Sequence, residues 1–105
     1  MQLYVCTLKI PIEIQDEAYT SFIEFIENDT AEEKSENYEL LHRYHIPLSG
    51  IIIIVCKANG AGALFRQFML WRSMFAIEID YLPALTDEEI VSLQKEHNFK
   101  LDSMD

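Results

Sequence analysis

The chain has 105 residues, of which half are hydrophobic and a quarter are charged, as in an ordinary globular protein. A chain of this length fits one domain over residues 1–105, and disorder is not expected over most of it. The formal net charge of −10 argues against partners such as nucleic acids or anionic membrane surfaces, because binding to either needs a basic patch.

The first half of the chain predicts a strand, a helix and a hairpin. Residues 2–10 are rich in β-forming side chains and predict a strand that ends at Pro11. In 13–28 the apolar residues Ala18, Phe22, Phe25 and Ile26 recur at helical spacing, with acidic residues on the other side. The acidic segment 29–38 predicts a solvated connection with a short turn capped by Thr30 and Glu33. Two strands, 39–46 and 51–57, are joined by "PLSG" as a hairpin loop.

The run "IIIIV" in the strand 51–57 does not alternate between apolar and polar residues. A strand with this pattern is expected inside the sheet and covered on both faces. Cys6 and Cys56 lie in the two most hydrophobic strands, where thiols usually behave as small buried hydrophobes. The segment "ANGAG" then predicts a turn between this strand and the next helix.

The second half predicts a helix, a strand and a final helix. The helix 62–75 places Leu64, Phe68, Trp71 and Phe75 on one narrow stripe. The strand 76–82 alternates strictly and is expected to stop at Pro83. A short helix within 86–98 begins with a capping box, Thr86 with Glu89, and is expected to turn Ile90 and Leu93 inward.

This order, β-α-β-β-α-β plus a terminal helix, predicts an α+β domain of ferredoxin-like fold. In that fold a four-stranded antiparallel sheet has its first and third strands in the centre and two helices on one face. The other face is left bare and apolar, so we expect two copies to pack through their sheets as a homodimer, a dimeric α/β barrel.

Features of the N-terminal segment and the apolar runs favour the cytoplasm. "MQLYVCTLKIPIE" has neither the basic start nor the small-residue cleavage site of a signal peptide. The longest apolar run, "GIIIIVC", is far shorter than the roughly 18 residues that span a bilayer. Two cysteines without a C-x-x-C motif fit a reducing compartment.

Several short motifs resemble an uncharacterised family of small bacterial proteins, a domain of unknown function with a dimeric α/β-barrel fold. They are "LLHRYH" (40–45) with the apolar strand after it, Trp71 in the second helix, and "AIEIDYLPALTDEEI" (76–90). Arg43, Tyr44, His45 and Trp71 match the family's Arg-aromatic-His strand end and its helical tryptophan. His42 departs from the pattern, where glycine is usual, and so does the long acidic connection 29–38. The resemblance implies a fold and no known reaction.

The two histidines of "HRYH" suggest a metal site, but strand geometry argues against it. His42 and His45 are separated by an odd number of residues, so in a regular strand they point to opposite faces. Only a β-bulge between them would bring them together. His97 lies far along the chain, and no spacing supplies the three or four ligands of a zinc site. No metal or other cofactor is therefore predicted.

Arg43 and His45 share the face opposite His42 and Tyr44, and two interpretations of them stay open. In the structural one, Arg43 pairs with a carboxylate of a partner subunit, Glu78 or Asp80, because these lie on the far edge of its own sheet. The domain then has a non-catalytic role in binding or assembly, with itself as partner.

In the functional interpretation, Arg43 and His45 line a cleft that holds a small molecule, so that the protein is a binder or an enzyme. Arg43 binds an anionic group, His45 is a candidate general base, and Tyr44, Phe68 and Trp71 form the apolar wall. A cavity of roughly a few hundred Å³ beside Arg43 and His45 favours this interpretation. A cleft filled by the three aromatic residues contradicts it.

Overall fold

Four antiparallel strands form one sheet in the order β2-β3-β1-β4 in the computed structural model, which describes residues 1–104. The strands are β1 (Gln2–Lys9), β2 (Tyr38–Ile46), β3 (Ile51–Ala58) and β4 (Glu78–Ala84). The first and third strands therefore lie in the centre and the second and fourth at the edges, as expected. The predicted α+β class and the four-stranded antiparallel sheet are confirmed.

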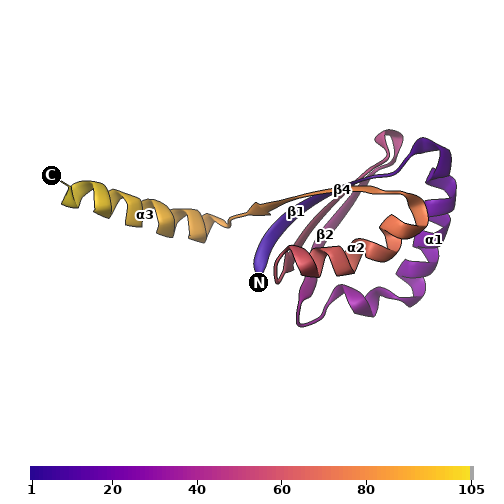
Figure 1. Cartoon of the computed structure of the whole chain (residues 1–105), viewed down its shortest axis with the longest axis horizontal. Helices are drawn as coiled ribbons and strands as arrows, with labels where there is room; N and C mark the ends of the chain where they lie inside the picture. Colours follow the sequence, from indigo (N-terminus) through magenta and orange to yellow (C-terminus); the bar gives the residue numbers. More distant parts are fainter. Residues whose placement is uncertain (105) are drawn as a thin grey trace.

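Two helices, α1 (Gln15–Asn28) and α2 (Ala61–Phe75), pack on one face of the sheet (Figure 1). The predicted stripe of α2 is confirmed, with Leu64, Phe68 and Phe75 buried and Trp71 packed against the core. From α1, Ala18 is buried, whereas Ile26 of the expected helical stripe is exposed. Short 3-10 turns occupy Ile12–Ile14, Thr30–Glu33 and Pro47–Ser49.

The core lies between these helices and the inner face of the sheet. On this face the buried side chains alternate along the two central strands, as pleating requires. They are Tyr4, Cys6 and Leu8 of β1 and Ile52, Ile54, Cys56 and Ala58 of β3. Both cysteines are free and fully buried, as expected. The hydrogen bond to Cys56, together with burial, raises the pKa of the Cys6 thiol well above its ordinary value.

The outer face of the sheet is apolar at its centre, and the described part of the chain places no helix over it (Figure 1). One row across the strands joins Leu82, Val5 and Val55, and the next joins Ile53 and Tyr44. Charged residues edge these rows: Glu39, Lys57, Lys9, Glu78 and Asp80. The isoleucine run was expected to be covered on both faces, and residues 1–104 supply cover for the inner face only.

Three predictions about the last third of the chain were wrong. β4 continues through Pro83 to Ala84, because Pro83 lies on an edge strand where a missing N–H donor is tolerated. The final helix, α3 (Asp87–Ser103), is 17 residues long rather than short. Ile90 and Leu93 do not face inward: every residue from 87 to 104 is exposed.

α3 projects away from the sheet as a continuation of β4, and the molecule is correspondingly elongated, with extents of 62 × 29 × 19 Å (Figure 1). The start of α3 is as predicted. The Thr86 hydroxyl accepts a hydrogen bond from the Glu89 backbone N–H, and the Glu89 carboxylate accepts one from the Thr86 N–H. In residues 1–104, no helix combines the length and the apolar composition that crossing a bilayer requires.

Candidate functional site

The orientation of the "HRYH" side chains is set by an irregularity in β2. The register with β3 shifts between Leu40 and His42, which is the signature of a β-bulge. Beyond it Arg43 lies opposite Ile54, so it points toward the helices, while His42 lies opposite Val55 on the outer face. His45 follows Arg43 to the inner face. The two histidines therefore point to opposite faces, as strand geometry predicted, because the bulge lies before both of them.

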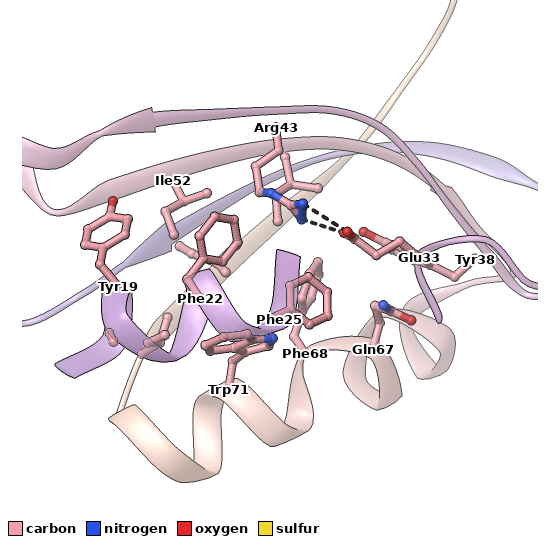
Figure 2. Close-up of a pocket in the computed structure, with 14 residues that line it drawn as sticks. Tyr19, Phe22, Phe25, Glu33, Tyr38, Arg43, Ile52, Gln67, Phe68 and Trp71 are labelled. Carbon is pink, nitrogen blue, oxygen red and sulfur yellow. Dashed lines mark hydrogen bonds and ion pairs between the residues drawn. The ribbon is translucent and has the colours of Figure 1, made fainter. Parts of the chain in front are cut away.

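Arg43 is held by Glu33, which comes from the 3-10 turn between α1 and β2 (Figure 2). Arg43 Nη2 donates to Glu33 Oε1 at 2.9 Å, and Nη1 donates to Oε2, so the pairing is bidentate. Both side chains are largely buried, with 13% and 11% of their surface exposed. Burial raises the pKa of the Glu33 carboxyl, and the Arg43 charge opposes that shift. The pair is therefore a partly desolvated one, of the kind that fixes local geometry.

Aromatic rings from α1 surround the guanidinium (Figure 2). The Arg43 Cζ atom lies 5.0 Å from the centre of the Phe22 ring and 5.8 Å from that of Phe25. These are distances at which a cation is attracted to the face of a ring. Trp71 of α2 closes the cluster, with its ring centre 5.6 Å from Phe25 and 6.2 Å from Phe22. The planar guanidinium is thus enclosed by apolar surface on the helix side and by one carboxylate.

A cavity of about 50 Å³ lies within this cluster. Residues from both helices, three strands and the turn at Glu33 line it, with Glu33, Arg43 and Gln67 as its main polar groups. This volume holds about three or four water molecules and is well below the roughly 300 Å³ at which ligand pockets begin. The cleft is therefore nearly filled, mainly by Phe22, Phe25, Phe68 and Trp71.

His45 lies at the rim of the cluster rather than inside it. Its Nδ1 atom is 3.4 Å from the Tyr19 hydroxyl, and its ring centre is 5.0 Å from that of Phe22. Partial burial and the nearby Arg43 charge lower the pKa of His45 below its ordinary value of 6.5. Near pH 7 the ring is therefore neutral, and one of its nitrogens is free to accept a proton.

Four of the five residues proposed for a ligand site lie together, and one does not. Arg43, Phe68 and Trp71 line the cavity, and His45 lies at its rim. Tyr44 was wrongly placed in the apolar wall: it points to the outer face, is 59% exposed and stacks on His42 with ring centres 6.1 Å apart. The reason is the alternation of the strand, which separates neighbouring residues.

Arg43 is not oriented for the expected pairing with Glu78 or Asp80 of a partner subunit. Arg43 faces the helices and is already paired with Glu33 of its own chain. Glu78 and Asp80 lie on the opposite edge strand, and they occupy the outer face beside Lys9 and Thr7. Two of the five guanidinium N–H donors bind Glu33, and the largely buried side chain faces the helices, away from the outer face on which a sheet-to-sheet partner would pack.

Several members of this cluster are not marked by the sequence pattern. Glu33 was assigned to a helix-type cap with Thr30, but the turn has no side-chain cap and the carboxylate points to Arg43 instead. Phe22 and Phe25 were recognised only as an apolar stripe, and Tyr19 and Gln67 were not singled out. Nothing in the acidic run 29–36 marks Glu33 apart from its neighbours, because only tertiary contact buries it.

Within residues 1–104 no three His, Cys, Asp or Glu side chains gather closely enough to hold a metal ion. The polar groups that line the cleft are the Arg43–Glu33 ion pair, the Gln67 amide and the hydroxyls of Tyr19 and Tyr38.

Comparison with known proteins supplies a family and no function. No curated protein matches the chain. One family model matches residues 2–98, nearly the whole length, which confirms the resemblance to an uncharacterised family seen in the sequence motifs. The chain therefore belongs to the family described as Domain of unknown function (DUF3303).

Proposed function

We propose that this protein is an assembly domain of ferredoxin-like fold, which forms a homodimer by packing two sheets face to face as a dimeric α/β barrel. The observation that carries the proposal is the outer face of the sheet. Val5, Val55, Ile53, Tyr44 and Leu82 form an apolar patch with residues from all four strands, and Thr7 and His42 lie beside it. Tyr44 and Leu82 are 59% and 70% exposed in the isolated chain.

The arrangement of this face has the composition of a protein interface. Its centre is apolar and its edges carry both charge signs, with Lys9 beside Glu78 and Lys57 beside Glu39. Two-fold packing of identical faces is self-complementary and closes after two copies. The position of β1 and β3 in the centre of the sheet supports the ferredoxin-like assignment. Two free cysteines in the core favour the reducing cytoplasm as its location.

Sedimentation equilibrium of the purified chain tests this proposal. The wild type is expected at twice the mass of the 12.3 kDa chain. Tyr44→Glu puts a charge into the apolar part of this face in both copies, so the dissociation constant should rise at least about 100-fold, roughly 2.7 kcal/mol. Leu48→Glu is the matched control, because Leu48 is 97% exposed on the hairpin turn and lies off this face. A wild type that stays at 12.3 kDa at micromolar concentration contradicts the proposal.

A second candidate function is the binding of a small carboxylate in the aromatic cleft, and the bidentate pair of Arg43 with Glu33 favours it. A ligand carboxylate that displaces Glu33 would find the same two donors, flanked by Phe22 and Phe25. The present cavity of about 50 Å³ would then enlarge by the volume that the Glu33 side chain vacates.

Titration with phenylacetate, followed by the fluorescence of Trp71, tests the second function, because Trp71 is the single tryptophan and lines the cleft. Glu33→Gln removes the competing charge and should tighten phenylacetate binding about tenfold. Phenylacetamide, which lacks the charge, is the control ligand. Equal responses to the two ligands, or no response from Glu33→Gln, would contradict this function.

A further inference from the structure

Every residue of α3 is exposed, and the helix carries a mainly apolar stripe. At 100° per residue, Ile90, Leu93, His97 and Leu101 fall within an arc of about 80°. Ile90, Leu93 and Leu101 are each about half exposed. A helix of 17 residues in water is only marginally stable by itself, so a stripe of this kind needs an apolar surface to pack against.

The dimensions of the molecule also show that α3 extends away from the rest of the fold. The radius of gyration is 17.6 Å, whereas a compact chain of this length has about 13 Å. The difference comes from α3, which extends away from the rest of the molecule (Figure 1). An arm of this shape is typical of chains that complete their packing on another copy.

A groove that suits such a helix lies on the helix side of the same chain, between α2 and β4. It has a volume of about 1100 Å³. Phe65, Met69 and Arg72 recur along α2 at the spacing of one helical face, and Tyr81 comes from β4. Phe65, Met69 and Tyr81 are each about half exposed. Arg72 of α2 and Glu78 and Asp80 of β4 also line it, so the groove is partly apolar and carries both charge signs.

The stripe and the groove match in length and in charge. The stripe from Ile90 to Leu101 is about 18 Å long, and α2, which borders the groove, is about 22 Å long. Glu89, Glu96 and Lys100 lie on one flank of the stripe, and the groove carries Arg72 together with Glu78 and Asp80. Seating the stripe in the groove thus allows both charge signs of the flank to meet opposite charges of the groove.

The connection between β4 and α3 determines whether α3 can reach the groove of its own chain. Only Leu85 and Thr86 separate the two elements, and the capping box holds Thr86 in an extended conformation with φ −79° and ψ 167°. α3 therefore continues the direction of β4, away from the groove beside it. Folding back onto its own groove would require a complete reversal at Leu85 and loss of the cap, whereas docking on another copy requires neither.

We propose that α3 of one copy docks in the groove between α2 and β4 of a second copy, and that the exchange is reciprocal. The arms then form a second interface, separate from the outer face of the sheet. With the proposed function this inference shares only the presence of a second copy, and it uses different residues.

Cross-linking of the full-length chain tests the exchange. The double variant Met69→Cys with Leu93→Cys places one thiol in the groove and one on the stripe. Cys6 and Cys56 are fully buried and do not compete. Under mild oxidation we expect a disulfide between residues 69 and 93 of different chains, seen as a dimer on a non-reducing gel and assigned by peptide mass. Mixing ¹⁵N-labelled and unlabelled chains before oxidation identifies links between copies.

The matched control is Met69→Cys with Phe99→Cys, because Phe99 lies on the side of α3 opposite the stripe, about 180° from Ile90. Its yield of linked dimer should be at least fivefold lower. A link from 69 to 93 within one chain shows that α3 folds back and overturns the inference. A link from 93 to 93, no link, or equal yields in the control overturn it as well.

The two proposals fail separately. If Tyr44→Glu leaves the dimer intact while the link between 69 and 93 of different chains forms, the exchange of α3 is supported and the sheet interface is contradicted. If Tyr44→Glu dissociates the dimer and no link forms between chains, the sheet interface is supported and the exchange of α3 is contradicted.

Discussion

Arg43 and Glu33 form a bidentate ion pair that ties the central part of β2 to the turn after α1. The two residues are ten positions apart, and both are nearly buried. The pair fixes the acidic connection 29–37 against the aromatic cluster, which that segment would otherwise leave open to solvent.

Removal of one partner of this pair should destabilise the fold strongly. Glu33→Ala leaves the Arg43 guanidinium buried without its carboxylate, and a loss of about 2–4 kcal/mol is expected. The double variant Glu33→Ala with Arg43→Met removes both charges and should recover more than half of that loss, because no unpaired charge stays buried. Urea denaturation of the wild type, Glu33→Ala, Arg43→Met and the double variant gives the coupling energy. Additive losses in the double variant would show that the two residues do not interact.

The stability of the fold should depend on pH through His45. Its pKa is lowered in the folded state, so the unfolded chain binds a proton more readily than the folded one. The stabilising contribution is therefore present above the ordinary value of 6.5 and is lost as pH falls toward the folded-state pKa. His45→Gln should flatten this part of the stability profile, and an unchanged profile would contradict the prediction. NMR titration of the His45 imidazole measures the shift directly.

Two phenylalanines, one buried in α2 and one exposed on α3, test the packing of the aromatic core. Phe68 is 6% exposed and forms an edge-to-face contact with Tyr38, at 6.1 Å between ring centres. Phe68→Ala should destabilise the fold by about 3–5 kcal/mol through the cavity it leaves. Phe99→Ala, on the far side of α3, should change stability by less than about 0.5 kcal/mol. Thermal unfolding at equal protein concentrations compares them, and similar losses would contradict the burial of Phe68.

The hairpin between β2 and β3 depends on Gly50. It has φ +67°, and a Cβ atom there would lie 2.6 Å from the Ile10 carbonyl oxygen and 2.8 Å from Gln15 Nε2. The backbone cannot move away easily, because the Ile10 N–H donates to the Gly50 carbonyl at 2.7 Å. Gly50→Ala should therefore destabilise the fold by about 2–4 kcal/mol, combining left-handed strain and close contact.

Gly62 is the control for this substitution, since it lies in the first turn of α2 and a Cβ there meets open space. Gly62→Ala should stabilise the fold by up to about 1 kcal/mol, because alanine restricts the unfolded chain. Denaturant midpoints of both variants check the contrast. Equal effects would mean that position 50 tolerates a side chain and that the hairpin geometry differs.

The sequence by itself determined the elements and their faces. The change from alternating to helical spacing located four strands and two core helices, and the alternation of β2 separated Arg43 and His45 from His42 and Tyr44. The capping box placed the start of α3. These features depend on the local periodicity of the backbone, which neighbouring residues determine.

Only the tertiary structure decided what those faces contact. Glu33 resembles the other acidic residues of its segment until the turn brings it to Arg43, and a pairing first sought in another subunit proves to lie within the chain. Pro83 was expected to end β4, but its place at the sheet edge removes the need for its N–H. The apolar stripe of α3 predicted an inward face, and its direction from β4 leaves that face exposed, because periodicity defines which residues share a surface and not what covers it.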